Sequence, residues 1–353
     1  MSKKTNTKAE TMGELERFIS YLSIPRDSKD VRKNFSGIKK LFELAEEKGF
    51  SLHRTHDKKV FLIPTSSYEE KIFKMQIGVN SNGMPVNNVR LFIFPDKIHK
   101  KKVEKIRFIP MGDLKFGSPI CDLDKFKQNI KWISRDEHVF TFFVGNMFDS
   151  TAAKNEDEAD FLVKRLSKII APIRNKILFA IPGPEEVKLR KKENIGFDPL
   201  EKLLPEAYIQ EFQAKVGIKF EGKQKIIKIF AIHGQSNAII TGAKINPLYN
   251  ILKFTDADVL VMANLKYAHG SKPINQEFNP ETRKIEDKKV FLILVPAFEK
   301  YENSSDAMKG RPPQFSGSES FVFYREEGDV HLYTSSDINR EADIIQSIAK
   351  GGK

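Results

Sequence analysis

Six short, almost uninterrupted apolar runs lie beyond residue 103 of this 353-residue chain, and they limit the folds it can adopt. Apolar runs of this length are typical of strands buried on both faces of a sheet. Helical patterns at residues 122–134, 156–170 and 246–254 separate several of the runs. This alternation indicates an α/β or α+β layered domain, which we place at residues 103–337. The runs span residues 106–110, 139–144, 177–181, 226–232, 259–262 and 290–295.

A smaller helical segment precedes this domain. The apolar residues within 15–22 share one helical face, Ser28 can cap a second helix, and residues 35–48 carry the pattern of a third. Two strand-like runs follow within residues 50–63. Three helices followed by a hairpin resemble a winged helix-turn-helix domain, which we place at residues 12–64.

Three further segments lack a strong pattern. We expect residues 1–11 to form a flexible, basic N-terminus. Residues 65–102 are rich in turn-forming residues and are expected to connect the two domains. Residues 338–353 are expected to form a C-terminal tail.

The chain is basic, with 59 Lys and Arg against 47 Asp and Glu and a net charge of +12. Such a charge suits a polyanionic partner, although a lysine-rich surface without a partner is equally compatible with it. In a winged helix the third helix and the wing meet duplex DNA. The alternative is a helical domain that packs on a protein partner. The candidate nucleic-acid contacts are Lys33, Lys39, Lys40, Arg54, Lys58 and Lys59.

The chain has a single cysteine, Cys121, which excludes a disulfide framework and a cysteine-based zinc site. A lone cysteine fits a reducing compartment. No apolar run approaches the roughly 18 residues of a membrane helix, and the N-terminus lacks the apolar core of a signal peptide. We therefore expect a cytoplasmic protein without a membrane partner.

Polar residues follow five of the expected strands. In a layered fold, ligand-binding residues gather in the loops after the carboxyl ends of strands. The loops therefore define one candidate site. Its residues are Asp113, Lys115, Asn146, Glu185, His233, Asn264 and Lys266.

The order of these loops resembles the calcineurin-like metallophosphoesterases. That family carries Asp-x-His, Gly-Asp, Gly-Asn-His-Asp/Glu, a His often followed by Gly, and Gly-His-x-His, and these residues bind two divalent metals. The similarity is best over residues 229–262, and the segment GDLKFGSP is similar to the first family loop. The later segment FEKYENSSDAMKGRPP and the winged-helix-like domain resemble phage-type members, which implies a phage-infected host as one setting. The resemblance implies a calcineurin-like sandwich.

The departures from the family pattern predict a degenerate metal site. Lys115 and Lys266 stand where the family has histidines, and Asn146 stands where it has the bridging carboxylate. Protonated lysine offers no lone pair and repels divalent ions, so we expect no metal cofactor. The two lysines are instead expected to neutralise Asp113 and Glu185. The sequence thus predicts a pseudoenzyme that binds DNA or acts as a scaffold.

Two other functions stay open at this point. One is a weakly active phosphodiesterase or nuclease that holds a divalent metal such as Mn²⁺ through Asp113, Asn146 and His233. The other is a structural protein whose lysines only cover its surface.

Overall fold

The structure is a computed structural model in which the chain forms two compact units, residues 1–70 and residues 71–353. The residues described are 17–18, 21–22, 26–47, 50–54, 59–64, 72–79, 85–99, 101–192, 195–234, 241–280, 282–302, 304–310, 319–326 and 330–333. The expected N-terminus at residues 1–11 and tail at residues 338–353 lie outside these ranges.

The N-terminal unit combines helices with a small antiparallel sheet. Residues 17, 18 and 21 are helical, and helices α2 (Ser28–Asn34) and α3 (Ile38–Glu47) follow. The sheet has the order β1-β3-β2, and its strands are β1 (Arg26–Asp27), β2 (Phe50–Arg54) and β3 (Lys59–Pro64). Its small apolar core is made by Phe18, Leu22, Val31, Phe35, Leu41 and Ala45. The described residues therefore include the second and third expected helices and both strands of the expected hairpin, whereas most of the first expected helix lies outside them.

The second unit contains a six-stranded sheet, the first sheet, with the order β11-β10-β9-β8-β19-β20. Strands β8 to β11 run parallel, whereas β19 is antiparallel to β8 and to β20. The strands are β8 (Lys105–Met111), β9 (Val139–Val144), β10 (Ile177–Ile181), β11 (Tyr208–Ile209), β19 (Ser320–Tyr324) and β20 (Val330–Tyr333).

A seven-stranded sheet, the second sheet, has the order β15-β18-β14-β13-β12-β5-β4. Its centre is parallel, from β13 through β14 to β18. The strands are β4 (Lys74–Val79), β5 (Pro85–Phe94), β12 (Gln213–Phe220), β13 (Ile227–Ile232), β14 (Val259–Met262), β15 (His269–Ser271) and β18 (Phe291–Leu294).

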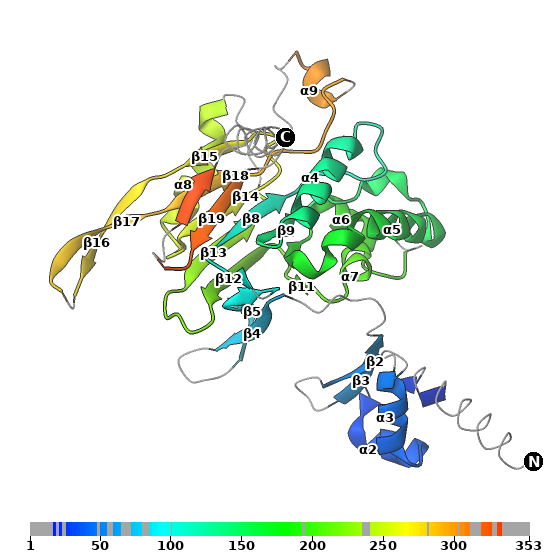
Figure 1. Cartoon of the computed structure of the whole chain (residues 1–353). Coiled ribbons are helices and arrows are strands. Elements are labelled where there is room, and N and C mark those ends of the chain that lie inside the picture. The colour runs from blue at the N-terminus through cyan, green and yellow to red at the C-terminus, as the bar shows by residue number, and fades with distance from the viewer. Residues whose placement is uncertain are drawn as a thin grey trace, which may run out of the picture. The chain divides into compact units, whose positions relative to one another are not determined.

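The two sheets pack face to face with helices outside (Figure 1). Side chains from the inner faces of both sheets form one apolar core that is rich in phenylalanine. Helices α4 (Leu123–Arg135), α5 (Glu156–Ile170), α6 (Pro184–Arg190) and α7 (Pro199–Leu203) cover the first sheet. Helix α8 (Asn246–Leu252) covers the second. The layered α/β fold expected from the apolar runs is confirmed.

Strand alternation explains these layers. Along β9, Phe140, Phe142 and Val144 face the core between the sheets, and Val139 and Phe143 face the helices. Successive side chains of a strand point to opposite faces, so a strand with apolar groups on both sides is buried on both.

The remaining elements are short. They are β6 (Lys97–Ile98), β7 (Lys101–Lys102), η1 (Ser150–Ala152), η2 (Ala171–Lys176), η3 (Thr241–Ile245) and α9 (Ser305–Met308).

The structure differs from the sequence expectation between the domains. Residues 65–102, expected as a connector, contain β4 and β5 of the second sheet, and β5 pairs in parallel with β12. The alternating pattern of these strands, interrupted by turns, concealed them. A further hairpin of β16 (Ile274–Asn279) and β17 (Lys284–Lys289) was not expected either. No described helix has the length and apolar character needed to span a bilayer.

Candidate functional site

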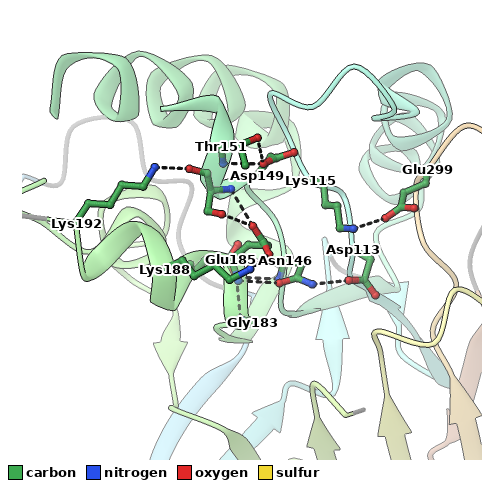
Figure 2. A network of polar contacts seen from close by, with 12 residues as sticks. Asp113, Lys115, Asn146, Asp149, Thr151, Gly183, Glu185, Lys188, Lys192 and Glu299 are labelled. Carbon is green, nitrogen blue, oxygen red and sulfur yellow. Dashed lines mark hydrogen bonds and ion pairs between the residues drawn. The ribbon is translucent and has the colours of Figure 1, made fainter. Parts of the chain in front are cut away.

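Asp113 is the centre of the candidate site, directly after β8. Its side chain is 1% exposed, and Oδ1 accepts a hydrogen bond from Asn146 Nδ2 at 2.9 Å. Oδ2 accepts from the backbone N–H of Asn264 at 2.6 Å, so Asp113 joins loops of both sheets. Burial raises the pKa of Asp113, and the nearby His233, the Asn146 hydrogen bond and the Lys115 charge oppose this only in part. Figure 2 shows Asn146 between Asp113 and the N-terminal end of α6, which carries Glu185.

His233 follows β13 and lies against the loop after β9. Its Nδ1 lies 2.7 Å from the carbonyl oxygen of Val144, which makes Nδ1 the protonated ring nitrogen. Nε2 is buried and has no hydrogen-bond partner among the described residues. Gly145, with φ of +79°, makes this approach possible, because a Cβ there would lie 2.3 Å from Nδ1. The structure therefore brings His233 to the same site as Asp113, as the sequence predicts.

A carboxylate that the sequence did not indicate bridges the two lysines. Lys115 Nζ lies 2.8 Å from Glu299 Oε1, and Lys266 Nζ lies 2.7 Å from Glu299 Oε2. The Glu299 side chain is 6% exposed and each lysine side chain is 24% exposed. Burial alone would lower the pKa of Lys115, but the Glu299 charge and hydrogen bond raise it above its ordinary value. The direct ion pairs of both lysines are therefore made with Glu299, and the charges of Asp113 and Glu185 also raise the pKa of Lys115.

The position of Glu299 follows from backbone pairing on both sides of it. Phe298 N donates to Asp113 O at 3.1 Å, and Lys300 N donates to Ile120 O at 2.7 Å. These bonds fix the segment after β18 beside the loop after β8. The segment FEKYENSSDAMKGRPP contains Glu299 but gives it no role, because its two partners lie more than 30 and more than 180 residues away in the sequence. Only the assembled fold identifies it.

The two adjacent glutamates of α6 have different surroundings. Glu185 Oε1 pairs with Lys188 Nζ at 2.7 Å, and Oε2 accepts from Ser150 N at 3.1 Å and from the Ser150 hydroxyl. Desolvation would raise the pKa of Glu185, but the Lys188 and Ser150 hydrogen bonds lower it overall. The direct contacts of the Glu185 carboxylate are therefore with Ser150 and Lys188 (Figure 2).

Glu186 is the buried glutamate that shapes the site. It is 1% exposed and accepts three backbone N–H groups, from Asn146 at 2.8 Å, Phe148 at 2.8 Å and Gly183 at 2.7 Å. Burial raises the pKa of Glu186 to about 7, although these donors favour the charged form. The carboxyl ties the loop after β9 to the loop after β10. The sequence prediction chose Glu185 and missed this neighbour.

Backbone strain is concentrated at the site. Among the described non-glycine residues, eight have a positive φ, and five of these belong to the site loops. Left-handed backbone costs free energy in residues with a Cβ and gathers at functional sites. This observation points to a site without using any motif. The five residues are Asp113, Lys115, Asn146, Asn264 and Lys266.

The donor groups do not fit a pair of divalent metals. Both oxygens of Asp113 accept N–H groups, and the amide oxygen of Asn146 accepts the backbone N–H of Glu185 at 3.1 Å. The charges of Lys115 and Glu299 act on Asp113, and Glu299 bridges Lys115 to Lys266. Within the described ranges, no three His, Cys, Asp or Glu side chains lie where they could hold a metal ion. A dinuclear site needs several anionic or imidazole ligands, including a bridge.

The candidate DNA-binding residues belong to the N-terminal unit. Lys33 at the end of α2 and Lys39 and Lys40 in α3 are exposed. Arg54 and Lys59 lie at the ends of β2 and β3, and their side chains are outside the described part, as is all of Lys58. The structure therefore places three of the six lysine and arginine side chains.

Comparison with known proteins finds structures of similar arrangement but no sequence relative. No protein-family model matches the chain, and no curated protein matches its sequence. Vacuolar Protein Sorting 29 from Cryptosporidium parvum is 13% identical with a TM-score of 0.30, covering 66% of this chain and 98% of its own. A predicted phosphoesterase from Streptococcus pneumoniae is 8% identical with a TM-score of 0.29, covering 66% of this chain and 99% of its own. NAD nucleotidase from Haemophilus influenzae is 13% identical with a TM-score of 0.32, covering 65% and 49%.

Proposed function

We propose that this chain is a phosphoesterase-like protein whose site works without metal, and that it acts as a nucleic-acid-binding or scaffold protein. The Lys115–Glu299–Lys266 bridge is the observation that carries the proposal. Its two ammonium groups supply positive charge where the resembling family holds two metal ions, and its carboxylate bridges them. The ion pairs of this charge cluster hold the loops together, so the loops need no metal ion to keep their arrangement.

The chemistry of the site is therefore that of positioned hydrogen bonds rather than of an activated water. Asp113 joins the loops of the two sheets, and Glu186 orders the loops after β9 and β10. His233 Nε2 is the one group among these whose buried nitrogen has no described partner. A lone imidazole nitrogen is a weak basis for hydrolysis, because phosphoryl transfer depends on electrostatic stabilisation of three equatorial oxygens.

The second candidate function is a weakly active, Mn²⁺-dependent phosphodiesterase or nuclease. The Nε2 of His233 is what favours it, since this nitrogen has no partner among the described residues, lies beside Asp113 and could accept a metal ion. Such an ion would also need oxygen ligands from Asp113 and Asn146. Both carboxylate oxygens of Asp113 and the amide oxygen of Asn146 already accept hydrogen bonds. We therefore place it second.

Metal content separates the two candidates. We expect purified full-length protein, dialysed against Mn²⁺, to hold far less than one ion per chain by elemental analysis. Phosphodiesterase activity on a chromogenic diester is expected to stay at the background rate with added Mn²⁺. Asp113→Ala serves as the matched control. Stoichiometric Mn²⁺ in the parent chain that disappears in Asp113→Ala would contradict the proposal and support the enzyme.

DNA is the partner we propose for the N-terminal unit. Its support is the exposed lysines of α2 and α3, together with a net charge of +5 over residues 1–60, from 14 Lys and Arg and 9 Asp and Glu. Neutralisation of phosphates by such groups makes binding depend on salt. The alternative is a protein partner for the same helices, and salt-sensitive affinity for duplex DNA distinguishes the two.

A further inference from the structure

The β16–β17 hairpin extends from the second unit (Figure 1), and one of its faces carries exposed apolar side chains. Ile274, Phe278 and Ile285 are 59%, 66% and 68% exposed. Phe278 lies opposite Ile285 in the strand register, and residues directly opposite each other share a face of the sheet. Ile274 lies four residues before Phe278, which places it on that face too. The hairpin therefore shows three large apolar side chains to solvent on one side.

The two edges of the hairpin differ in charge. Strand β17 reads KIEDKK, in which five of six residues are charged, whereas β16 reads INQEFN, in which one is. Lysine-rich edges resist the addition of a further strand, and uncharged edges permit it. Within the described ranges, the outer edge of β16 pairs with no other strand. The β16 edge is therefore the one open to a new strand.

We propose that this edge binds the same edge of a second copy of the chain. An antiparallel, two-fold pairing of β16 with its copy, centred on Gln276, places Ile274 of each chain opposite Phe278 of the other. Gln276 then lies opposite Gln276 of the copy. The result is a four-stranded sheet on which the exposed apolar side chains of both hairpins form one face.

Electrostatics favours this pairing over pairing through β17. Two β17 strands paired about Glu286 would place Glu286 opposite Glu286 of the copy and Lys284 opposite Lys288 of the copy, and like charges opposite each other are destabilising. In the β16 pairing, three strand spacings separate the β17 strands, about 14 Å, which exceeds the Debye length of about 8 Å at physiological salt. A lone two-stranded hairpin is marginally stable in water, and three or more strands with an apolar face are needed for stability.

Cross-linking through Gln276→Cys tests the register. Directly opposite Cα atoms of antiparallel strands lie about 4.5–5.5 Å apart, within the range of about 4.4–6.8 Å that a disulfide spans. The native Cys121 should not form disulfides in this experiment, since it is 9% exposed and burial raises its pKa to about 11. We expect full-length Gln276→Cys to form a covalent dimer under mild oxidation. The matched control is Asp287→Cys, which lies across from Gln276 on β17 and should stay monomeric on a non-reducing gel.

Charge complementation tests the same pairing without a disulfide. We expect the unmodified chain to reach twice the mass of one chain in sedimentation experiments as concentration rises. Ile274→Lys alone and Phe278→Glu alone should each give monomers, because a charge then faces an apolar side chain. The double variant should dimerise again, since each introduced lysine faces an introduced glutamate. Phe161→Glu, at a residue 59% exposed on α5, is the control and should not change the mass.

Two results would overturn the proposal. One is a monomer at every concentration together with no disulfide in Gln276→Cys. The other is a dimer that survives both single charge variants with an unchanged dissociation constant, which would place the interface elsewhere. Circular dichroism of each variant verifies that the fold is kept.

Discussion

At the scale of single residues, Glu299 is the group on which the candidate site depends most. The substitution Glu299→Gln removes the negative charge that lies between Lys115 and Lys266, so that the two ammonium groups lose their shared carboxylate. Breaking a buried pair costs about 3–5 kcal/mol, and partial exposure of the lysines reduces this to about 2–3 kcal/mol. We expect urea denaturation to show that loss in free energy of unfolding.

The matched control for Glu299→Gln removes all three charges at once. Replacing Lys115 and Lys266 by Met and Glu299 by Leu should cost less than Glu299→Gln alone, because apolar groups of similar volume replace buried ion pairs at little or no cost. A triple variant that is less stable than Glu299→Gln would contradict the view that charge balance governs this cluster.

Glu186 gives the protein a pH dependence of predictable sign. Its pKa is raised from 4.5 to about 7 in the folded chain, so the folded state holds a proton that the unfolded state releases between these values. The resulting stability is present below pH 4.5 and is lost as pH rises through about 7. The difference of 7 − 4.5 = 2.5 pH units corresponds to at most about 3 kcal/mol. Glu186→Gln should flatten the fall in unfolding free energy between pH 5 and pH 8.

The raised pKa of Asp113 acts in the same direction, so Glu186→Gln should reduce the pH dependence without abolishing it. Urea midpoints at pH 5, 6, 7 and 8 for both proteins measure the difference. Parallel curves for the two proteins would show that Glu186 does not titrate in this range.

At the scale of secondary-structure elements, the side chain of Lys176 caps the C-terminus of helix α4, although it lies about 40 residues further along the chain. Its side chain is buried, and Nζ donates to Ile133 O at 2.6 Å and Asp136 O at 2.7 Å. These are among the carbonyls that a helix C-terminus leaves unsatisfied. Lys176→Met should destabilise the protein by about 1–3 kcal/mol because it leaves buried acceptors unpaired. The control Lys168→Met, at an exposed position in the last turn of α5, should change thermal unfolding little.

Elements buried on both faces could be predicted from the sequence, and others could not. The runs at 139–144, 177–181 and 259–262 coincide with β9, β10 and β14, because both faces of each strand are apolar. Strand β12 alternates buried and more exposed residues, and β17 is almost wholly charged, so neither stands out as an apolar run. The site shows the same division. Its loops after strands were predictable, whereas Glu299 is selected by contacts between distant segments.

At the scale of the whole molecule, two compact units allow DNA affinity to be assigned by dissection. We propose that duplex affinity resides in residues 1–70. A chain beginning at Lys71 keeps β4 and β5 and so leaves the second sheet complete, whereas a break at 103 would remove these two strands. It should bind duplex DNA more weakly than the full chain, as measured by fluorescence anisotropy at two salt concentrations.

Neutralising Lys39, Lys40, Arg54 and Lys58 in the full chain should weaken binding and flatten its salt dependence. Removing one phosphate contact reduces the slope of log affinity against log salt by about 0.9, because fewer counterions are released. The matched control neutralises four lysines of the second unit that are exposed, Lys127, Lys131, Lys164 and Lys168. This variant lowers the net charge equally and should leave the slope unchanged. Equal effects of both variants would show that affinity follows total charge, and an absence of salt-sensitive binding in the full chain would favour a protein partner for the N-terminal helices.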